Sequence, residues 1–220
     1  LPTREDAVAA ARRFSAADLR DLQVWQKLAW IDPFYLEGDQ RVRRLLAKQR
    51  DFDESDKLIL AGVGHFESAM AGLQKSGLMD ALEQAVLVDK KPILGICLGM
   101  ELMAKTSEEG NVKGLGWLDA NVVRFRIADK LRYKVPHIGW NRVKVKKNSR
   151  LMKKIPDSAE FYFLHSYYLN LADQSDLLNE TNFETAFPAA VEKDNIFGVQ
   201  YHPEKSHQVG LQLLKNFVEM

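Results

Sequence analysis

The 220-residue chain contains 46% hydrophobic residues, enough to bury the core of one large domain or two small ones, which argues against disorder. Its 31 basic and 30 acidic residues give a net charge of +1, so no global field favours nucleic acid or an anionic membrane. The longest stretch without a charged residue, 161–172, is 12 residues long, short of the ~20 needed to span a bilayer. A single cysteine and no basic, apolar leader favour a reducing cytoplasm. We expect a cytoplasmic protein without a metal or cofactor.

Residues 1–56 differ in composition from the rest, because glycine and β-branched residues are scarce there. Apolar residues recur at helical spacing over positions 7–14, after a Thr3 and Asp6 pair that resembles a capping box. A second helix is predicted from residue 15 or 16 through Leu28 to about residue 32, and a third over 41–49. We interpret 1–56 as a helical segment of uncertain role.

From residue 57 onward, short apolar runs alternate with amphipathic stretches, a pattern typical of an α/β domain over 57–220. Buried strands are predicted at 58–60 and 92–96, with helical material over 66–88 around Gly77 and a helix over 98–105. The predicted later elements are strands at 122–125, 142–146, 161–164 and 196–201, and a terminal helix at 208–218.

Cys97 lies between Gly95 and Gly99, at the predicted junction of a buried strand and a helix. This arrangement is typical of a nucleophile elbow, in which a tight turn presents the nucleophile at a helix N-terminus that favours thiolate. Read alone, a lone cysteine is more often a small buried apolar residue. The flanking glycines make a catalytic thiol an equal alternative.

A base for this thiol is available where another predicted strand ends, at His202-Pro203-Glu204. Residues two apart in an extended chain face the same side, so Glu204 is placed to support the imidazole of His202. An isolated His-x-Glu is usually a solvent-exposed pair, but next to an elbow it suggests a Cys97, His202 and Glu204 triad. Gly62-Val63-Gly64, directly after a strand, offers backbone N–H groups that together with that of Leu98 suit an oxyanion.

Longer runs around these residues resemble a known family. They are 58–64, 91–100, 107–110, 136–141, 165–168 and 197–206, and they cover about 57–220 in order and spacing. They are similar to the class I, triad-type glutamine amidotransferases, most closely the HisH-type subunits of imidazole glycerol phosphate synthase. The resemblance implies a flavodoxin-like, mostly parallel sheet flanked by helices.

The same resemblance implies an activity and a partner. Cys97 would attack the side-chain amide of glutamine, His202 would move the proton and Glu204 would orient it, releasing glutamate and ammonia. The ammonia would pass to a HisF-type (β/α)8-barrel synthase. Implied oxyanion donors lie at Gly62, Val63 and Leu98; implied substrate contacts are Gly64, Gly99, Glu101, His165, Ser166 and Tyr167; implied partner-facing residues are His137, Trp140, Asn141 and Lys205.

The sequence departs from the family at several positions. Glu101 stands where the family usually has a Gln that contacts the substrate, Ala61 replaces a customary Pro, and His65 replaces a small residue. The family's opening strand, glycine turn, helix and second strand are not recognisable. Residues 1–56 instead resemble a helical segment of family 57 glycoside hydrolases, through 18–25 and 28–30, without that family's catalytic barrel.

Three alternatives remain open. The ammonia would serve histidine biosynthesis or, as 116–120 and 205–207 suggest, amidation of surface-polysaccharide sugars. Glu101 and the replaced N-terminus also fit a catalytically impaired binding subunit. Nucleic-acid binding through lysines and arginines of 144–154 is disfavoured, because their alternation with Val143 and Val145 is typical of a solvated strand face.

Overall fold

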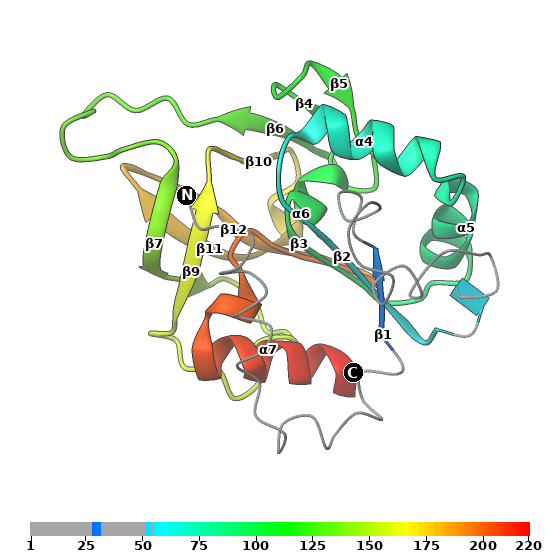
Figure 1. Ribbon diagram of the computed structural model, residues 1–220. Coiled ribbons are helices and arrows are strands. Elements are labelled where there is room, and N and C mark those ends of the chain that lie inside the picture. Colours follow the sequence, from blue (N-terminus) through cyan, green and yellow to red (C-terminus); the bar gives the residue numbers. More distant parts are fainter. Residues whose placement is uncertain (1–27, 32–51, 54) are drawn as a thin grey trace, which may run out of the picture.

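A seven-stranded sheet forms the centre of the protein in the computed structural model, which describes residues 28–31, 52–53 and 55–220 (Figure 1). Its strands follow the order β1-β2-β3-β13-β12-β11-β8. Their bounds are β1 Leu28–Ile31, β2 Lys57–Gly62, β3 Ile93–Cys97, β13 Ile196–Val199, β12 Thr185–Lys193, β11 Leu177–Phe183 and β8 Lys144–Val145. The first four strands pair in parallel and the last three pair antiparallel, so the sheet is mixed.

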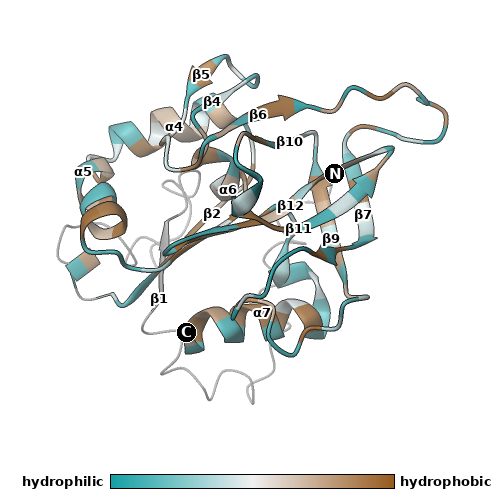
Figure 2. Cartoon of the chain, turned by 180° about the vertical axis from the view of Figure 1, so that it is seen from behind, coloured by the Kyte–Doolittle hydropathy of each residue, from teal (hydrophilic) through white to brown (hydrophobic). Residues whose placement is uncertain are grey.

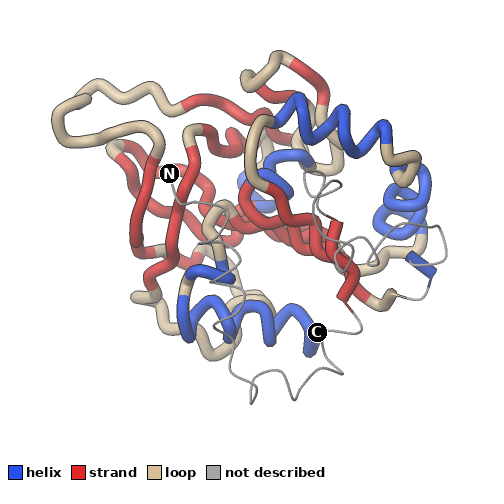
Figure 3. Tube along the Cα trace, in the orientation of Figure 1, coloured by secondary structure: helices blue, strands red, loops and turns tan. Residues whose placement is uncertain are grey.

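Helices cover both faces of this sheet (Figures 1 and 3). On one face lie α4 Phe66–Lys75, α5 Met79–Glu83, the π-helical turn η3 Gln84–Val88 and α6 Leu98–Leu102. The other face carries α7 His207–Glu219. Strand β2 contributes to the hydrophobic core on both faces of the sheet. Leu58 and Leu60 join the core under α4 and α6, whereas Ile59 joins the core under α7. The central strands are therefore mostly apolar, and brown segments are visible along β2 in Figure 2.

Two smaller sheets extend the central one beyond the carboxyl ends of its parallel strands. One has the order β10-β6-β4-β5, and the other pairs β7 with β9. The bounds are β4 Thr106–Ser107, β5 Val112–Lys113, β6 Ala120–Arg124, β7 His137–Arg142, β9 Glu160–His165 and β10 Tyr167–Leu171, with 3-10 turns η4 Gln174–Asp176 and η5 Pro203–Lys205.

Most elements predicted after residue 57 are confirmed, with ends displaced by one to three residues, but the strand predicted at 142–146 is instead the last residue of β7 and all of β8, with Val143 between them. The helix predicted over 98–105 is shorter, ending at Leu102. The carbonyls of Leu102, Ala104 and Lys105 accept instead from the N–H groups of Leu115, Gly116 and Gly114, at 2.8, 3.0 and 3.0 Å. A tertiary turn thus replaces the helix's own last bonds.

One prediction for the N-terminal segment is wrong. Residues 28–31, which the sequence places in a helix, form strand β1 and pair in parallel with β2, Leu28 opposite Lys57 and Ile31 opposite Leu60. A four-residue apolar run fits a strand as well as a helix, and the open edge of β2 supplies the backbone partners that favour the strand. The other helices predicted within 1–56 lie outside the described residues.

Candidate active site

Cys97 occupies the predicted elbow between β3 and α6. Its backbone has φ 52° and ψ −113°, a conformation that side-chain-bearing residues rarely adopt, and it directly precedes the first turn of α6. The side chain is 7% exposed, and its sulfur lies 3.9 Å from the Leu164 carbonyl oxygen and 3.9 Å from Nε2 of Gln200. The turn therefore aims the thiol at the ends of β9 and β13.

Glycine on either side of Cys97 is required by close packing. A Cβ on Gly95 would lie 2.7 Å from the backbone of Met100, and one on Gly99 would lie 1.7 Å from the Leu60 carbonyl oxygen. Helix α6 therefore packs directly on β2 and β3, and this close packing is a structural reason for glycine at position 99. Its predicted contact with substrate stays a prediction.

His202 and Glu204 follow β13, the parallel neighbour of β3. Nδ1 of His202 and Oε1 of Glu204 are 2.7 Å apart, while Nε2 of His202 is buried and hydrogen-bonds to none of the described residues. The imidazole is 2% exposed, but the Glu204 side chain is 39% exposed. The structure thus brings together the residues predicted as a triad, with the free ring nitrogen turned away from the carboxylate.

The electrostatics of this pair suit proton transfer to and from sulfur. Burial works against protonation of His202, but negative charge on the Cys97 sulfur and the Glu204 carboxylate outweigh it and raise the pKa of the imidazole to about 10. Burial likewise opposes ionisation of Glu204, yet its hydrogen bond to His202 holds the pKa of that carboxyl below its usual value. The arrangement favours an imidazolium and carboxylate pair beside the Cys97 sulfur.

Gln200 is a site residue that the sequence analysis missed. Its Nε2 donates to Oε1 of Glu101 at 2.8 Å, in a pair that is almost completely buried. Burial, the largest influence, raises the pKa of Glu101 to about 8 despite this hydrogen bond. Glu101 is therefore mainly a neutral acid at pH 7. Like the Gln usual at its position, it then offers a donor and an acceptor instead of a negative charge. Gln200 lies two residues before His202, and residues two apart in an extended chain face the same side. This spacing is the signal that could have revealed Gln200 as a site residue.

We expect Glu101→Gln to remove a pH dependence of stability. Because folding raises the pKa of Glu101, the folded state binds a proton more tightly than the unfolded state between about pH 4.5 and 8. This contribution is complete below pH 4.5 and is lost as the pH rises through 8, a fall on the order of 5 kcal/mol in the free energy of unfolding. Urea unfolding at pH 5, 6, 7 and 8 measures it; parallel curves for both proteins would contradict this account.

The predicted oxyanion turn lies beside Cys97. Gly62 is the register partner of Cys97 across β2 and β3, so Gly62, Val63 and Gly64 leave the sheet where α6 begins. Gly64 has φ 115°, which favours glycine, and Val63 is half exposed. A carboxylate oxygen of Glu109 accepts from the N–H of Phe66 at 2.7 Å and ties down the start of α4 just beyond this turn. The turn lies across from Cys97 and Leu98 directly follows it, while their role as oxyanion donors stays a prediction.

His165, Ser166 and Tyr167, predicted to contact substrate, form the turn from β9 to β10. The Leu164 carbonyl oxygen next to His165 is the one that contacts the Cys97 sulfur, which places this turn at the site. The ring of His165 is buried, and its Nδ1 lies 2.6 Å from the carbonyl oxygen of Tyr167. That nitrogen must donate, since a carbonyl only accepts.

The four residues predicted to face a partner separate into two pairs. Trp140 is 45% exposed and stacks on His207 with ring centroids 4.9 Å apart, and the Lys205 ammonium lies 5.7 Å from the Tyr162 ring centroid. His137, in contrast, is 4% exposed, and Asn141 is half-buried behind it. Strand alternation explains the split, because residues 138 and 140 face outward where 137 and 139 do not. His137 is not placed for direct docking.

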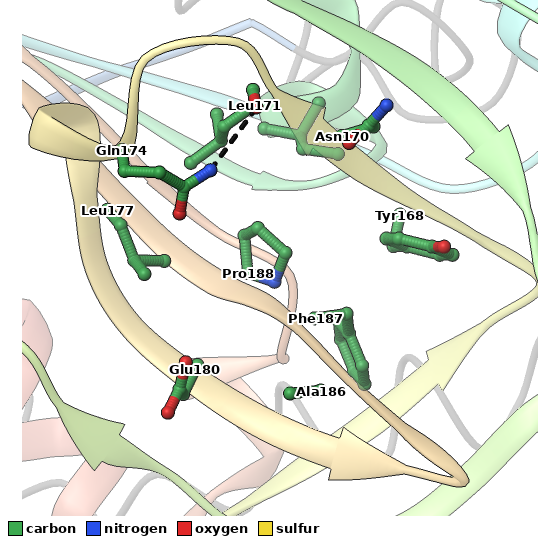
Figure 4. A pocket seen from close by; sticks show the side chains of 10 residues that line it. Tyr168, Asn170, Leu171, Gln174, Leu177, Glu180, Ala186, Phe187 and Pro188 are labelled. Carbon is green, nitrogen blue, oxygen red and sulfur yellow. Dashed lines mark hydrogen bonds between the residues drawn. The ribbon is translucent and has the colours of Figure 1, made fainter.

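Other candidate sites are weaker. A cavity of about 220 Å³ lies between β10 and the β11–β12 hairpin, lined in part by Gln174, Leu177, Glu180 and Pro188 (Figure 4), but it includes no predicted site residue. Across the described residues, no three His, Cys, Asp or Glu side chains gather as metal ligands. None of the described helices has the length and apolar character needed to cross a membrane.

Sequence comparison points to one family. The model of the family "Glutamine amidotransferase class-I" matches residues 40–220. Imidazole glycerol phosphate synthase subunit HisH 2 of Methanococcus maripaludis is 47% identical over 166 residues, covering 76% of this chain and 81% of that protein. The HisH 2 subunit of Pseudomonas aeruginosa is 46% identical over 172 residues, covering 78% of this chain and 84% of its own.

Solved structures agree on the fold. A crystal structure of a glutamine amidotransferase superimposes with a TM-score of 0.62 at 16% identity, covering 88% of this chain and all of the other. The glutaminase domain of Trypanosoma brucei CTPS gives a TM-score of 0.54 at 18% identity, covering 94% and 90% of the two chains. The α/β fold and the resemblance seen in the sequence are confirmed: the chain belongs to the class-I glutamine amidotransferases, among which the HisH subunits are similar to it over most of its length.

Proposed function

We propose that this protein is a HisH-type glutaminase subunit, which hydrolyses glutamine to glutamate and ammonia and supplies the ammonia to a HisF-type barrel synthase in histidine biosynthesis. The observation that carries the proposal is the buried His202 beside Glu204, with its free nitrogen available to the Cys97 elbow. Names of relatives that match more than three quarters of the chain support the pathway. A thiol nucleophile that must stay reduced suits the cytoplasm.

The geometry gives each residue a step. The Cys97 sulfur attacks the amide carbon of glutamine, and backbone N–H groups of Val63 and Leu98 stabilise the oxyanion. As the tetrahedral intermediate collapses, Nε2 of His202 gives its proton to the leaving nitrogen, and ammonia departs from a thioester. The same nitrogen then takes a proton from water, whose oxygen attacks the thioester and releases glutamate. Glu204 holds the ring in place through Nδ1.

Labelling of Cys97 tests this assignment directly. We expect a glutamine-like chloroketone to alkylate the Cys97 sulfur, as measured by mass spectrometry, and free glutamine to suppress the labelling. The experiment is run with the isolated chain and with an added barrel synthase, because a partner can complete the pocket. Labelling that glutamine fails to suppress, or no labelling in either sample, would contradict the proposal and favour an inactive binding subunit.

We further propose that the partner docks on the surface formed by the exposed Trp140 and the half-buried Tyr162 and Lys205. This surface, called the aromatic face below, combines the edge-to-face contact of Trp140 and Tyr162, with ring centroids 5.9 Å apart, and the Lys205 ammonium over Tyr162. Trp and Tyr side chains are enriched among interface hot spots. Glu204 immediately precedes Lys205, so a partner here would also cover the open side of the catalytic pair.

Trp140→Ala is expected to weaken binding of the barrel synthase at least about tenfold, since truncating a central aromatic residue typically costs 2 kcal/mol or more. Titration by calorimetry measures the affinity. Chloroketone labelling of the isolated variant should stay at the wild-type rate, because the Trp140 ring packs on His207 and Tyr162, which are not part of the triad. Lys215→Ala, which changes an exposed side chain near the other end of α7, is the control and should bind normally. Equal affinities for all three proteins would remove the aromatic face from the interface.

A further inference from the structure

Behind the candidate site, four residues form one continuous line of hydrogen bonds. Nδ2 of Asn141 lies 3.4 Å from Nε2 of His137, and Nδ1 of His137 lies 3.1 Å from Nε2 of His165. Nδ1 of His165 in turn lies 2.6 Å from the carbonyl oxygen of Tyr167. His137 and His165 are register partners on β7 and β9. The line, called the histidine relay below, thus runs from β7 to the turn at the active site.

Chemistry fixes the direction of every bond in the relay. The Tyr167 carbonyl can only accept, so Nδ1 of His165 carries the hydrogen and Nε2 of His165, in the neutral ring, must accept. Nδ1 of His137 therefore donates to it, which leaves Nε2 of His137 to accept from the Asn141 amide. That amide also donates to the carbonyl oxygen of Asn182 at 2.8 Å, which anchors the outer end. All donors point toward Tyr167.

The surroundings keep both rings neutral. His137 stacks between Phe163 and Phe183, with centroids 4.9 and 4.3 Å away, and Phe125 and Phe187 pack against His165 at 5.3 Å each. Burial in this aromatic shell lowers the pKa of His137 to about 4 and that of His165 to about 3. Neither ring gains a second proton near pH 7, so the tautomers depend only on the hydrogen bonds.

We propose that His137 is a positioning residue, which donates to Nε2 of His165 and thereby holds that ring, the Tyr167 carbonyl bonded to it and the turn from β9 to β10 in the shape that binds glutamine. The inference rests on the proposed glutaminase function for the identity of the ligand. Without a donor at position 137, Nε2 of His165 is an unpaired buried acceptor. The ring gains by turning toward another donor, which strains its hydrogen bond to the Tyr167 carbonyl and loosens the turn.

Two substitutions at one position separate this role from packing. His137→Phe keeps an aromatic ring between Phe163 and Phe183 but removes both nitrogens. His137→Asn places an amide nitrogen at the same number of bonds from Cα as Nδ1, so it can restore the donor, although it loses the ring. A residue that matters only for packing would tolerate Phe better than Asn, and a residue of the relay would show the opposite order.

The first measurement is the side-chain ¹⁵N NMR shift of Nε2 of His165 in the whole protein, which reports whether that nitrogen accepts a hydrogen bond. We expect the shift of a hydrogen-bonded acceptor in the wild type and in His137→Asn, and that of an unbonded nitrogen in His137→Phe. Should His137→Phe fail to fold, Asn141→Leu removes the outer donor and is expected to move the same resonance less far. An Nε2 shift that stays unchanged in the Phe variant, or in a folded Asn141→Leu used in its place, would overturn the relay.

The second measurement is protection of Cys97 from the chloroketone by glutamine. His137→Phe is expected to raise the glutamine concentration for half-protection about tenfold, the equivalent of one buried hydrogen bond, with the labelling rate at saturating probe within about twofold of wild type. His137→Asn should recover most of the loss. Unchanged half-protection in the Phe variant would contradict the positioning role. Failure of glutamine to protect the wild type would instead contradict the proposed function, whatever the Nε2 shift reports.

Discussion

Cys97→Ala is expected to abolish glutamine hydrolysis, with a fall in rate on the order of 10⁴-fold or more, because no other described side chain can supply the nucleophile. Among the described residues, Cys97 is the only thiol, and its sulfur lies where the ends of β9 and β13 meet the elbow. Ammonia release in the presence of the barrel synthase measures the effect. The free energy of unfolding should change by less than about 1 kcal/mol, since only one sulfur atom is removed.

The control for this prediction is Glu204→Gln, which leaves the thiol in place and removes the negative charge next to Nδ1 of His202. It should be labelled by the chloroketone more slowly than the wild type, whereas Cys97→Ala should not be labelled at all. Turnover retained by Cys97→Ala would exclude the thiol from the mechanism and with it the catalytic assignment of the elbow.

Gly99→Ala is expected to destabilise the protein by about 4 kcal/mol or more. A Cβ at this position would lie 1.7 Å from the carbonyl oxygen of Leu60, and the obstacle is backbone on β2, which cannot rotate aside. The helix must lift from the sheet, which disrupts the core beneath α6 as well as the turn that carries Cys97. Urea unfolding followed by circular dichroism measures the loss.

Gly62→Ala provides a matched comparison at a second glycine that packs against α6. Its added Cβ would meet the Leu98 side chain at 3.5 Å, an ordinary van der Waals contact. We expect a change within about 1 kcal/mol, because a methyl group fits there and reduces the entropy of the unfolded chain. Equal losses for both variants would mean that the close approach of α6 to β2 is not what requires Gly99.

The sequence predicts the parallel strands β2, β3 and β13 and the helices around them, because periodicity and glycines report burial locally, but it does not predict β10, β11 or β12. The elbow at Cys97 and the pair at His202 and Glu204 were predicted for the same reason: each depends on a short motif at a strand end. The family match agrees with that part of the chain.

What the sequence could not predict depends on contacts between distant segments. Strand β1 exists because β2 has an edge to pair with, and α6 stops at Leu102 because a turn more than ten residues later takes its carbonyls. The neutral state of Glu101 follows from burial around Gln200, and the buried setting of His137 follows from the pairing of β7 with β9. None of these partners lies within one turn of helix or one strand of the residue concerned.

The far border of the central sheet, β8, has a consequence for solubility. This strand is only two residues long and is followed by Lys146 and Lys147. Lys146 pairs with Glu180 at 3.0 Å, and Nζ of Lys147 donates to the Ser175 and Glu192 carbonyl oxygens at 2.6 Å each. Short strands and lysines are how natural sheets discourage edge-to-edge aggregation. The lysines of this basic run, for which the sequence disfavours nucleic-acid binding, are therefore well placed as gatekeepers that keep this edge from pairing with a second molecule.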